Sequence, residues 1–259
     1  MSAPALLTCR GLTRRFGGVV ALDGLDLEVQ PGSVLGLIGP NGSGKTTFFN
    51  VLTGLFPADA GESRFASAPI TRLRPQAVYR IGIARTFQRS RLCLPLSIFE
   101  NLMVGNHQRL DHGLWFNLVR RGRLARQIGE SYETARALLR IFDPPLADRM
   151  MEPAGRIPMI DRRRVEVCRA LISRPKLLLL DEPSAGMTHE ETVRLMDDIL
   201  QVKHELGDLT IILIEHEMSV IERVTARCVV LNYGRKIAEG TYAEVSHDPG
   251  VRQAYLGLE

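Results

Sequence analysis

Short apolar runs alternate with amphipathic segments along most of this 259-residue chain. Residues Val34–Ile38, 177–180 and Thr210–Ile214 are almost wholly apolar and too short for helices, which predicts strands buried on both faces. Segments 46–55 and 190–206 instead carry apolar side chains at helical spacing. Buried strands that alternate with helices predict an α/β fold built on a parallel sheet that is covered on both faces.

The same pattern predicts further elements on either side of this core. Segments 6–12 and 25–29 alternate or cluster their apolar residues as strands do. A short helix is predicted over 70–80 and a short strand over 81–88, which ends in a polar loop. Near the C-terminus, segment 229–239 predicts a hairpin, because two strand-like runs flank a Tyr-Gly turn.

The middle of the chain has a helical pattern. Segments 97–105 and 132–142 carry apolar residues on one face, and the prolines between 144 and 153 predict a loop after them. The basic run from Arg120 to Arg126 predicts a solvated helix face, and contact with lipid head groups or an acidic partner loop is the alternative. From residue 90 to about residue 153, the chain therefore predicts a helical insertion between two α/β parts.

A glycine-rich segment links the strand Val34–Ile38 to the helix after it. It has the form G-x-x-x-x-G-K-T and comprises Gly39, Pro40, Asn41, Gly42, Ser43, Gly44, Lys45, Thr46 and Thr47. In this context it predicts a phosphate-binding loop, because inward N–H groups and the helix dipole attract an anion. The predicted ligand is a nucleoside triphosphate, with Lys45 on the β- and γ-phosphates and the Thr46 hydroxyl on Mg²⁺. The alternative is a glycine turn before an ordinary helix.

Acidic and imidazole side chains follow two of the other predicted strands. Asp181 and Glu182 come directly after the run 177–180, at the strand end where ligands collect in α/β sheets. Asp181 is placed to hold Mg²⁺, and Glu182 to polarise the attacking water. His216 follows Thr210–Ile214 in the same way and is placed to contact the γ-phosphate and Glu182.

Two further residues extend the candidate site. Gln88 ends another predicted strand, where its neutral amide is placed to touch Mg²⁺ or the attacking water. Phe16 lies just before Gly17-Gly18, and its ring is a candidate platform for adenine, because aromatic faces accept any base. The alternative for Phe16 is a plain strand residue.

Composition narrows the class of protein. Apolar residues make up 45% and charged residues 24% of the chain, as in ordinary globular proteins. The net charge of +4 is too weak and too dispersed to indicate a nucleic-acid partner. The four cysteines form no C-x-x-C pair, which predicts neither a disulfide framework nor a zinc site. With no signal-peptide pattern and no run of about 18 apolar residues, we expect a cytoplasmic protein.

Together these motifs resemble the ATP-binding subunit of ABC transporters over nearly the whole chain. Phe16 matches the adenine-stacking aromatic of that family, and Gln88 matches its Q-loop glutamine. Asp181 and Glu182 match the Walker B aspartate and the catalytic glutamate, and His216 matches the switch histidine. Segment 184–187 is similar to the D-loop of the family.

Four stretches are similar to the branched-chain (hydrophobic) amino acid importers within that family, and importers of urea and short amides share much of them. These stretches are 82–88, 214–218, 233–240 and 254–257. The resemblance implies a P-loop NTPase of the ABC type with a mostly parallel sheet and an N-terminal antiparallel β subdomain. It also implies a single 1–259 domain with an inserted α-helical subdomain at approximately 90–174.

The resemblance also implies a function. ATP and Mg²⁺ are the expected cofactors, and ATP hydrolysis is expected to power import of branched-chain amino acids or related small polar or amide substrates. The implied partners are a second ABC ATPase subunit in a heterodimer and two membrane permease subunits. The resemblance also implies an extracytoplasmic substrate-binding protein, reached through the permeases, and no nucleic-acid partner. The implied location is the cytoplasmic face of the plasma (inner) membrane, as a peripheral protein.

One motif departs from the family pattern. The signature loop, of the type L-S-G-G-Q or L-A-Y-G-D-Q, corresponds here to Ile157, Pro158, Met159, Ile160 and Asp161, ahead of a matching helix over 165–172. Pro158 replaces a serine and has no N–H, and Ile160 replaces a glycine, which hinders close approach of a phosphate. We expect a poor clamp for the ATP of the opposite subunit, with a loss of ~2–6 kcal/mol and Arg162 as a partial substitute.

Two alternative functions follow from the same residues. One is a non-transport ABC ATPase, which usually carries a coiled-coil insertion or tandem ATPase domains, and neither is evident in the sequence. The other is a catalytically impaired regulatory subunit that binds ATP. The degenerate signature loop favours the regulatory alternative, whereas intact Glu182 and His216 oppose it.

Overall fold

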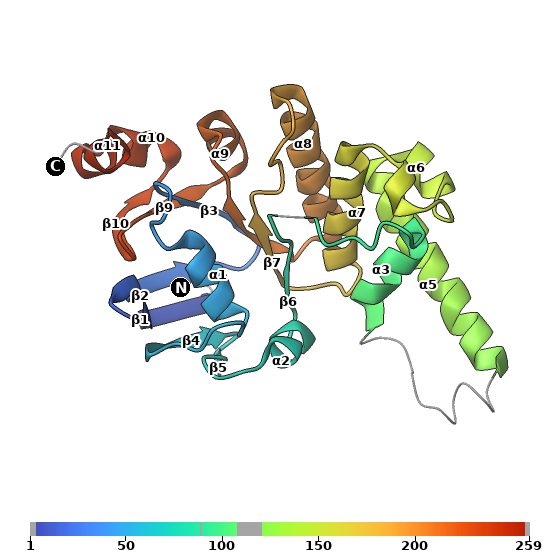
Figure 1. Cartoon of the computed structure of the whole chain (residues 1–259), viewed down its shortest axis with the longest axis horizontal. Coiled ribbons are helices and arrows are strands. Elements are labelled where there is room, and N and C mark those ends of the chain that lie inside the picture. The colour runs from blue at the N-terminus through green and yellow to red at the C-terminus, as the bar shows by residue number, and fades with distance from the viewer. Residues whose placement is uncertain (1–3, 89, 108–120, 257–259) are drawn as a thin grey trace. The chain divides into compact units, whose positions relative to one another are not determined.

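Residues 4–88, 90–107 and 121–256 are described by the computed structural model, which divides into two compact units (Figure 1). The first unit comprises Met1–Arg85, Lys176–Glu182 and Gly207–Glu259. The second comprises Thr86–Pro175 and Pro183–Leu206. None of the described helices is long and apolar enough to span a lipid bilayer.

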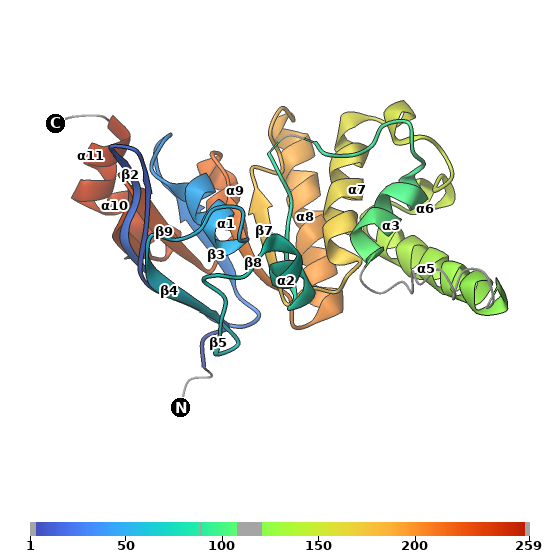
Figure 2. The ribbon, with the colours of Figure 1, turned by 60° about the horizontal axis from the view of Figure 1, so that its bottom comes forward.

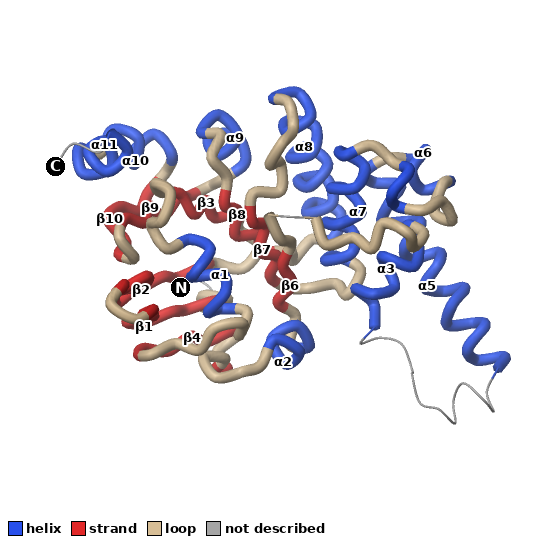
Figure 3. The backbone as a smooth tube through the Cα atoms, viewed as in Figure 1, coloured by secondary structure: helices blue, strands red, loops and turns tan. Residues whose placement is uncertain are grey.

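The first unit contains two sheets. An antiparallel sheet has the strand order β2-β1-β4-β5, and a six-stranded sheet has the order β10-β9-β3-β8-β7-β6 (Figure 3). All neighbours in the larger sheet are parallel except β10 and β9, so the predicted parallel sheet is confirmed. The strands are β1 (Leu7–Phe16), β2 (Val19–Val29), β3 (Val34–Ile38), β4 (Ala60–Phe65), β5 (Ala68–Pro69), β6 (Ile83–Arg85), β7 (Leu177–Asp181), β8 (Thr210–Ile214), β9 (Arg227–Asn232) and β10 (Arg235–Gly240).

Helix α1 forms the centre of the core in this unit. Phe48 and Phe49 of this helix are fully buried, in one apolar cluster with residues of both sheets, among them Leu12 and Leu37. Figure 1 shows α1 on one face of the six-stranded sheet, with α9 and α10 on the other. The packing fixes the carboxyl end of β3 and the start of α1. The helices of this unit are α1 (Lys45–Leu52), α2 (Pro75–Arg80), α9 (Met218–Val224), α10 (Tyr242–His247) and α11 (Pro249–Leu256).

The second unit is helical in its described part, and Figure 2 shows α3, α5 and α7 side by side. Its helices are α3 (Ile98–Asn106), α5 (Arg121–Phe142), α6 (Pro144–Asp148), α7 (Met159–Leu171) and α8 (His189–Leu206), with a 3-10 turn, η2 (Ala154–Arg156). Arg164 of α7 ties this bundle together through ion pairs with Asp143, Asp161 and Asp198 at 2.9, 3.1 and 2.9 Å. Because these acids precede α6, begin α7 and lie on α8, one guanidinium joins three helices.

Three expectations about the elements need correction. The proline-bracketed segment after residue 143 is partly helical, because Asp143 caps α6 by accepting from the Leu146 N–H at 3.2 Å and prolines suit the first helical positions. The helix expected over 132–142 extends back to Arg121, while Arg120 of the basic run lies outside the described residues. The helix expected over 70–80 begins only at Pro75, since proline favours the first turn.

Candidate functional site

The phosphate-binding loop connects β3 to α1 in the first unit, where two glycines are required by the backbone. Gly39 has φ 147° and Gly44 has φ 107°, which side chains on an L-residue strongly disfavour. A Cβ atom on Gly39 would collide with the carbonyl oxygen of Leu231, and one on Gly44 would lie 2.5 Å from that of Ala21. The loop is therefore held against β9 and β2 by close main-chain approach.

The polar groups of this loop are arranged for an anion. The Nζ of Lys45 donates to the carbonyl oxygens of Gly39 and Pro40 at 2.7 and 3.0 Å, so it lies folded over the loop. Burial lowers the pKa of Lys45, and the carboxylates of Glu182 and Asp181 oppose that shift. The buried Ser43 Oγ finds no hydrogen-bond partner among the described residues.

The first turn of α1 completes this arrangement. Thr46 lies exposed in that turn, where helix N–H groups have no partner within the helix. Three features of the loop together fit a polyphosphate: the partnerless buried hydroxyl of Ser43, the ammonium of Lys45 and the N-terminus of α1. The exposed Thr46 hydroxyl is suitable for a divalent cation that accompanies it.

A second support of the loop comes from the hairpin turn between β9 and β10. The Gly234 N–H donates to the carbonyl oxygen of Ser43 at 2.9 Å, and its own carbonyl accepts from the Asp23 N–H at 3.0 Å. Arg235 also forms an ion pair with Asp23 at 2.6 Å. The sequence predicted this turn as a hairpin only, because nothing local to it indicates contact with the loop.

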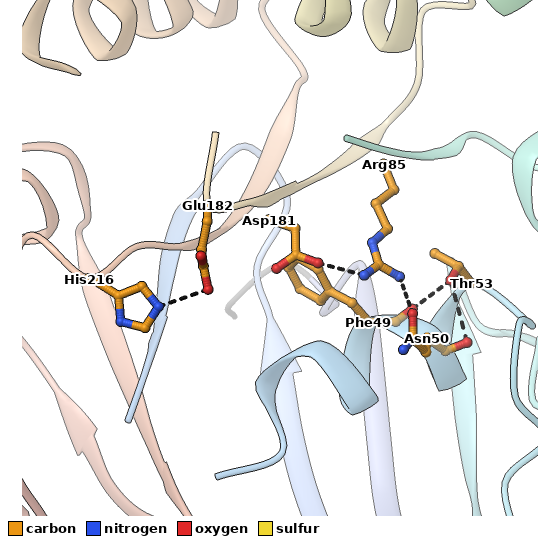
Figure 4. Close-up of polar contacts among 7 residues, drawn as sticks. All are labelled: Phe49, Asn50, Thr53, Arg85, Asp181, Glu182 and His216. Carbon is orange, nitrogen blue, oxygen red and sulfur yellow. Dashed lines mark hydrogen bonds and ion pairs between the residues drawn. The ribbon is translucent and has the colours of Figure 1, made fainter. Parts of the chain in front are cut away.

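The two predicted carboxylates lie at the end of β7, as Figure 4 shows. Asp181 is the last residue of the strand and its side chain is 3% exposed. Burial raises the pKa of its carboxyl, and Arg85 opposes that rise. Glu182 has φ 48°, a left-handed conformation that is unfavourable for any residue except glycine, and its N–H donates to the Ile214 carbonyl at 3.0 Å. The Glu182 carboxylate points toward His216 (Figure 4).

His216 meets Glu182 at this point. Its Nε2 lies 2.8 Å from Glu182 Oε1, and an ionised carboxylate only accepts, so Nε2 carries the hydrogen (Figure 4). The side chains of His216 and Glu182 are 48% and 16% exposed. The first unit therefore brings together the phosphate-binding loop, Asp181, Glu182 and His216, which the sequence placed on separate strand ends.

The structure adds two residues that the sequence did not single out. Arg85, the last residue of β6, donates from Nη2 to Asp181 Oδ2 at 2.6 Å and from Nη1 to Asn50 Oδ1 at 2.7 Å. Asn50 belongs to α1, the helix that begins in the phosphate-binding loop. The sequence offered one indication of this contact, because Arg85 is a basic residue near the end of a predicted strand. The sequence pattern could not show which side chains Arg85 contacts.

Phe16 is the last residue of β1 and is 39% exposed. The edge of Phe56 packs against it, with ring centroids 5.2 Å apart, and the Arg14 guanidinium carbon lies 4.6 Å from the Phe16 centroid. Arg14 is held in turn by Asp59 at 3.1 Å. The ring is thus fixed by a cation and a second aromatic, and its exposed part is available to a base.

Gln88 lies in the second unit, where side chains of α7 hold the adjoining backbone. The Gln88 carbonyl accepts from Arg163 Nη2 at 2.8 Å, and the Arg91 N–H donates to Glu166 Oε1 at 2.7 Å. Arg163 and Glu166 are also paired with each other at 2.8 Å, and both are buried. The segment around Gln88 is therefore attached to α7.

The signature residues form the start of α7 in the same unit. The helix begins at Met159, earlier than expected, and Pro158 is its N-cap residue without a side-chain cap. Ile157 is buried, Met159 is 47% exposed, and Ile160 is half-buried. Asp161 pairs with Arg164 at 3.1 Å.

The guanidinium of Arg162 is partly engaged by the backbone that precedes α7. Its Nε donates to the carbonyl of Ile157 at 3.0 Å, and its Nη2 donates to that of Gly155 at 2.8 Å. These bonds stabilise the bend before α7. Donation to a phosphate from Nε or Nη2 would require these bonds to break.

Two family models match the chain. The model described as ABC transporter matches residues 22–185, and the model described as branched-chain amino acid ATP-binding cassette transporter matches residues 235–259. The first match contains the phosphate-binding loop and both strand-end carboxylates. The second contains the last strand and the two C-terminal helices.

Relatives match over the full length. The high-affinity branched-chain amino acid transport ATP-binding proteins LivG of Escherichia coli K12 and BraF of Pseudomonas aeruginosa are each 37% identical over 257 residues, which covers 99% of both chains. Among solved structures, the ADP conformation of MJ1267, an ATP-binding cassette of an ABC transporter, is similar with a TM-score of 0.83. It is 29% identical, and the match covers 98% of this chain and 100% of that one.

Proposed function

The chain belongs to the ATP-binding subunits of ABC transporters, and on that premise we propose that it powers an importer of branched-chain amino acids. Related small polar or amide substrates are included, because the permeases and the binding protein select the cargo. The main support for this proposal is the 37% sequence identity to LivG and BraF over 99% of each chain. The match of residues 235–259 to the branched-chain model supports it as well. The activity of the subunit is ATP hydrolysis.

The first unit supplies the groups that bind ATP. We propose that Phe16 stacks on adenine and that the glycine loop, with Lys45 and the unpaired Ser43 hydroxyl, receives the triphosphate. Mg²⁺, held by Thr46 and Asp181, would neutralise charge on the phosphates, and Gln88 of the second unit stays a predicted ligand from the sequence. Glu182 and His216 are proposed to act on the attacking water beside the bound phosphates.

Glu182 and His216 are the proposed catalytic pair. Glu182 orients and polarises the attacking water, and the 2.8 Å bond from His216 Nε2–H fixes which way its carboxylate points. The left-handed backbone at Glu182 supports this assignment, because strained residues persist where the surrounding structure holds a working geometry. Gln88 is proposed to contact Mg²⁺ or a water, and its backbone carbonyl, which accepts from Arg163, links its position to α7.

We propose that the chain works beside a second, different ABC ATPase subunit. Pro158 caps α7 without an N–H, and Ile160 occupies the following turn, so the helix start is a poor phosphate clamp for the opposite subunit. The remaining proposed partners are two permeases and, through them, an extracytoplasmic substrate-binding protein. The proposed place is the cytoplasmic face of the inner membrane, and no nucleic acid is involved.

The defective clamp predicts a low rate for the chain by itself. Single-turnover hydrolysis of ATP should be slow with the chain alone and should rise when its partner ATPase is added. The double variant Pro158→Ser, Ile160→Gly should raise the rate of the chain alone at least about tenfold, since it restores charge-assisted donors to the phosphate. Fast hydrolysis by the unaltered chain alone would contradict the asymmetric arrangement.

Uptake measurements test the transport proposal directly. Deletion of the gene should abolish high-affinity uptake of radiolabelled leucine, isoleucine and valine by the source organism. The wild-type gene should restore uptake, and the Glu182→Gln variant should not. Unchanged uptake of all three, with loss of urea or amide uptake, would reassign the cargo. Unchanged uptake of every solute would favour the regulatory alternative.

A further inference from the structure

We infer that Arg85 is a positioning residue that holds the Asp181 carboxylate at a fixed place relative to the phosphate-binding helix. This inference rests on the proposed Mg²⁺-ATP site and adds to it a residue that the family motifs do not include. Its basis is a buried contact among three elements of the first unit, β6, β7 and α1.

The contact uses both arms of one guanidinium. Nη2 of Arg85 donates to Asp181 Oδ2 at 2.6 Å, and Nη1 donates to Asn50 Oδ1 at 2.7 Å (Figure 4). The side chains of Arg85 and Asp181 are 5% and 3% exposed, so solvent screens this pair little. A planar fork with two occupied arms determines the orientation of Asp181, which a single flexible ammonium cannot do.

Helix α1 provides the second anchor of the guanidinium. The ring centroid of Phe49 lies 5.4 Å from the Arg85 guanidinium carbon, and Asn50 is the next residue along the helix. The same helix begins at Lys45, which is proposed to bind the phosphates. Arg85 therefore sets the spacing between the carboxylate proposed to hold the metal and the helix proposed to hold the phosphates.

The local backbone gives this spacing a further role. Strands β6 and β7 are parallel neighbours, and the chain leaves the first unit directly after Arg85 and directly after Glu182. The Arg85–Asp181 pair therefore links the ends of β6 and β7, next to the two points where the chain passes out of the first unit. Because of this link, a shift of the backbone at either point would be resisted by the ion pair on Asp181, the carboxylate proposed to hold the metal.

A purely structural ion pair is the competing explanation. Buried ion pairs are weak evidence for stability, because desolvation of both groups offsets their attraction. A structural role would lower stability and nucleotide affinity together, with or without metal. A positioning role would lower only the gain in nucleotide affinity that Mg²⁺ produces, since Arg85 would act on the metal through Asp181.

Titration of a fluorescent ATP analogue in EDTA and in Mg²⁺ separates the two explanations. For Arg85→Lys, we expect the affinity in EDTA to stay within about twofold of wild type. The increase in affinity upon addition of Mg²⁺ should fall by about tenfold, as is typical when a group that orients a metal ligand is lost. Asn50→Ala, which removes only one acceptor, should show a smaller loss in the same direction. Arg227→Lys, in an exposed pair with Glu239, is the matched control and should change neither value.

A double-mutant cycle tests whether Arg85 acts through Asp181. In an Asp181→Asn background, Arg85→Lys should have no further effect on the Mg²⁺ increment. An equal effect in both backgrounds, or equal losses in EDTA and Mg²⁺, would overturn the inference. If Arg85→Lys fails to fold, an Asn50→Ala variant with a wild-type Mg²⁺ increment overturns it as well. A wild-type chain without any Mg²⁺ increment would instead overturn the proposed metal site.

Discussion

Replacement of Glu182 by Gln is expected to lower the rate of ATP hydrolysis by about 10³-fold, within the range for loss of a general base. Glutamine has the same shape but cannot accept a proton from the attacking water. It can still accept the 2.8 Å hydrogen bond from His216, so the local geometry should survive. ATP affinity should therefore stay within about threefold of wild type, because the carboxylate is not among the phosphate-binding groups.

The rate is best measured by single-turnover hydrolysis in the complex of the tagged chain with its partner ATPase. Equilibrium binding of ATP and thermal unfolding should be recorded on the same samples. Glu62→Gln is a suitable control, since its exposed pair with Arg64 lies on the antiparallel sheet. A Glu182→Gln complex that hydrolyses ATP at nearly the wild-type rate would show that another group accepts the proton.

The sequence could predict two parts of this site. One is the glycine loop, whose conformation is local, and the other is the set of residues that follow parallel strands, whose carboxyl ends share one edge of the sheet. The glycine loop is recognisable because its conformation is set within a few residues, between β3 and α1. Asp181, Glu182 and His216 are predictable because parallel strands bring their carboxyl ends to one edge, so separate strand ends must meet there. The 2.8 Å contact between Glu182 and His216, which follow the neighbouring parallel strands β7 and β8, is an example.

Contacts across long stretches of chain were not predictable. Arg85 and Asp181 are 96 residues apart in sequence, and their contact depends on the register of β6 against β7. Strand β6 has only three residues, so periodicity carries almost no information about its partners. The bond from Gly234 to Ser43 is similar, because it depends on where a hairpin turn lies in space.

The start of α7 shows a different limit. The sequence indicated that the signature residues are degenerate, but not that they form the first helical turn behind an N-cap proline. Nor could it show that Arg162 is engaged by two carbonyls of the preceding bend. Both features depend on how segment 155–158 folds back, which is a tertiary property.

Lys45 offers the strongest test of nucleotide binding itself. Substitution by Met should weaken ATP binding by about 100-fold, since charge-assisted hydrogen bonds to phosphate contribute about 1.5–3 kcal/mol each. The ammonium already lies at the loop, on the carbonyls of Gly39 and Pro40, so little reorganisation is needed for it to meet a phosphate. Methionine retains much of the stem and its packing but cannot donate a hydrogen bond.

Fluorescence titration with an ATP analogue, in parallel with thermal unfolding, measures this effect. The unfolding midpoint is needed because the carbonyls of Gly39 and Pro40 lose their donor in the variant, which destabilises the empty loop to some degree. Lys236→Met is the matched control, because Lys236 pairs with Glu239 on β10, outside the proposed nucleotide-binding residues, and should bind ATP normally. If folded Lys45→Met binds ATP within about threefold of wild type, the triphosphate does not lie in this loop. The assignment of residues 39–47 would then be wrong, whatever the family of the chain.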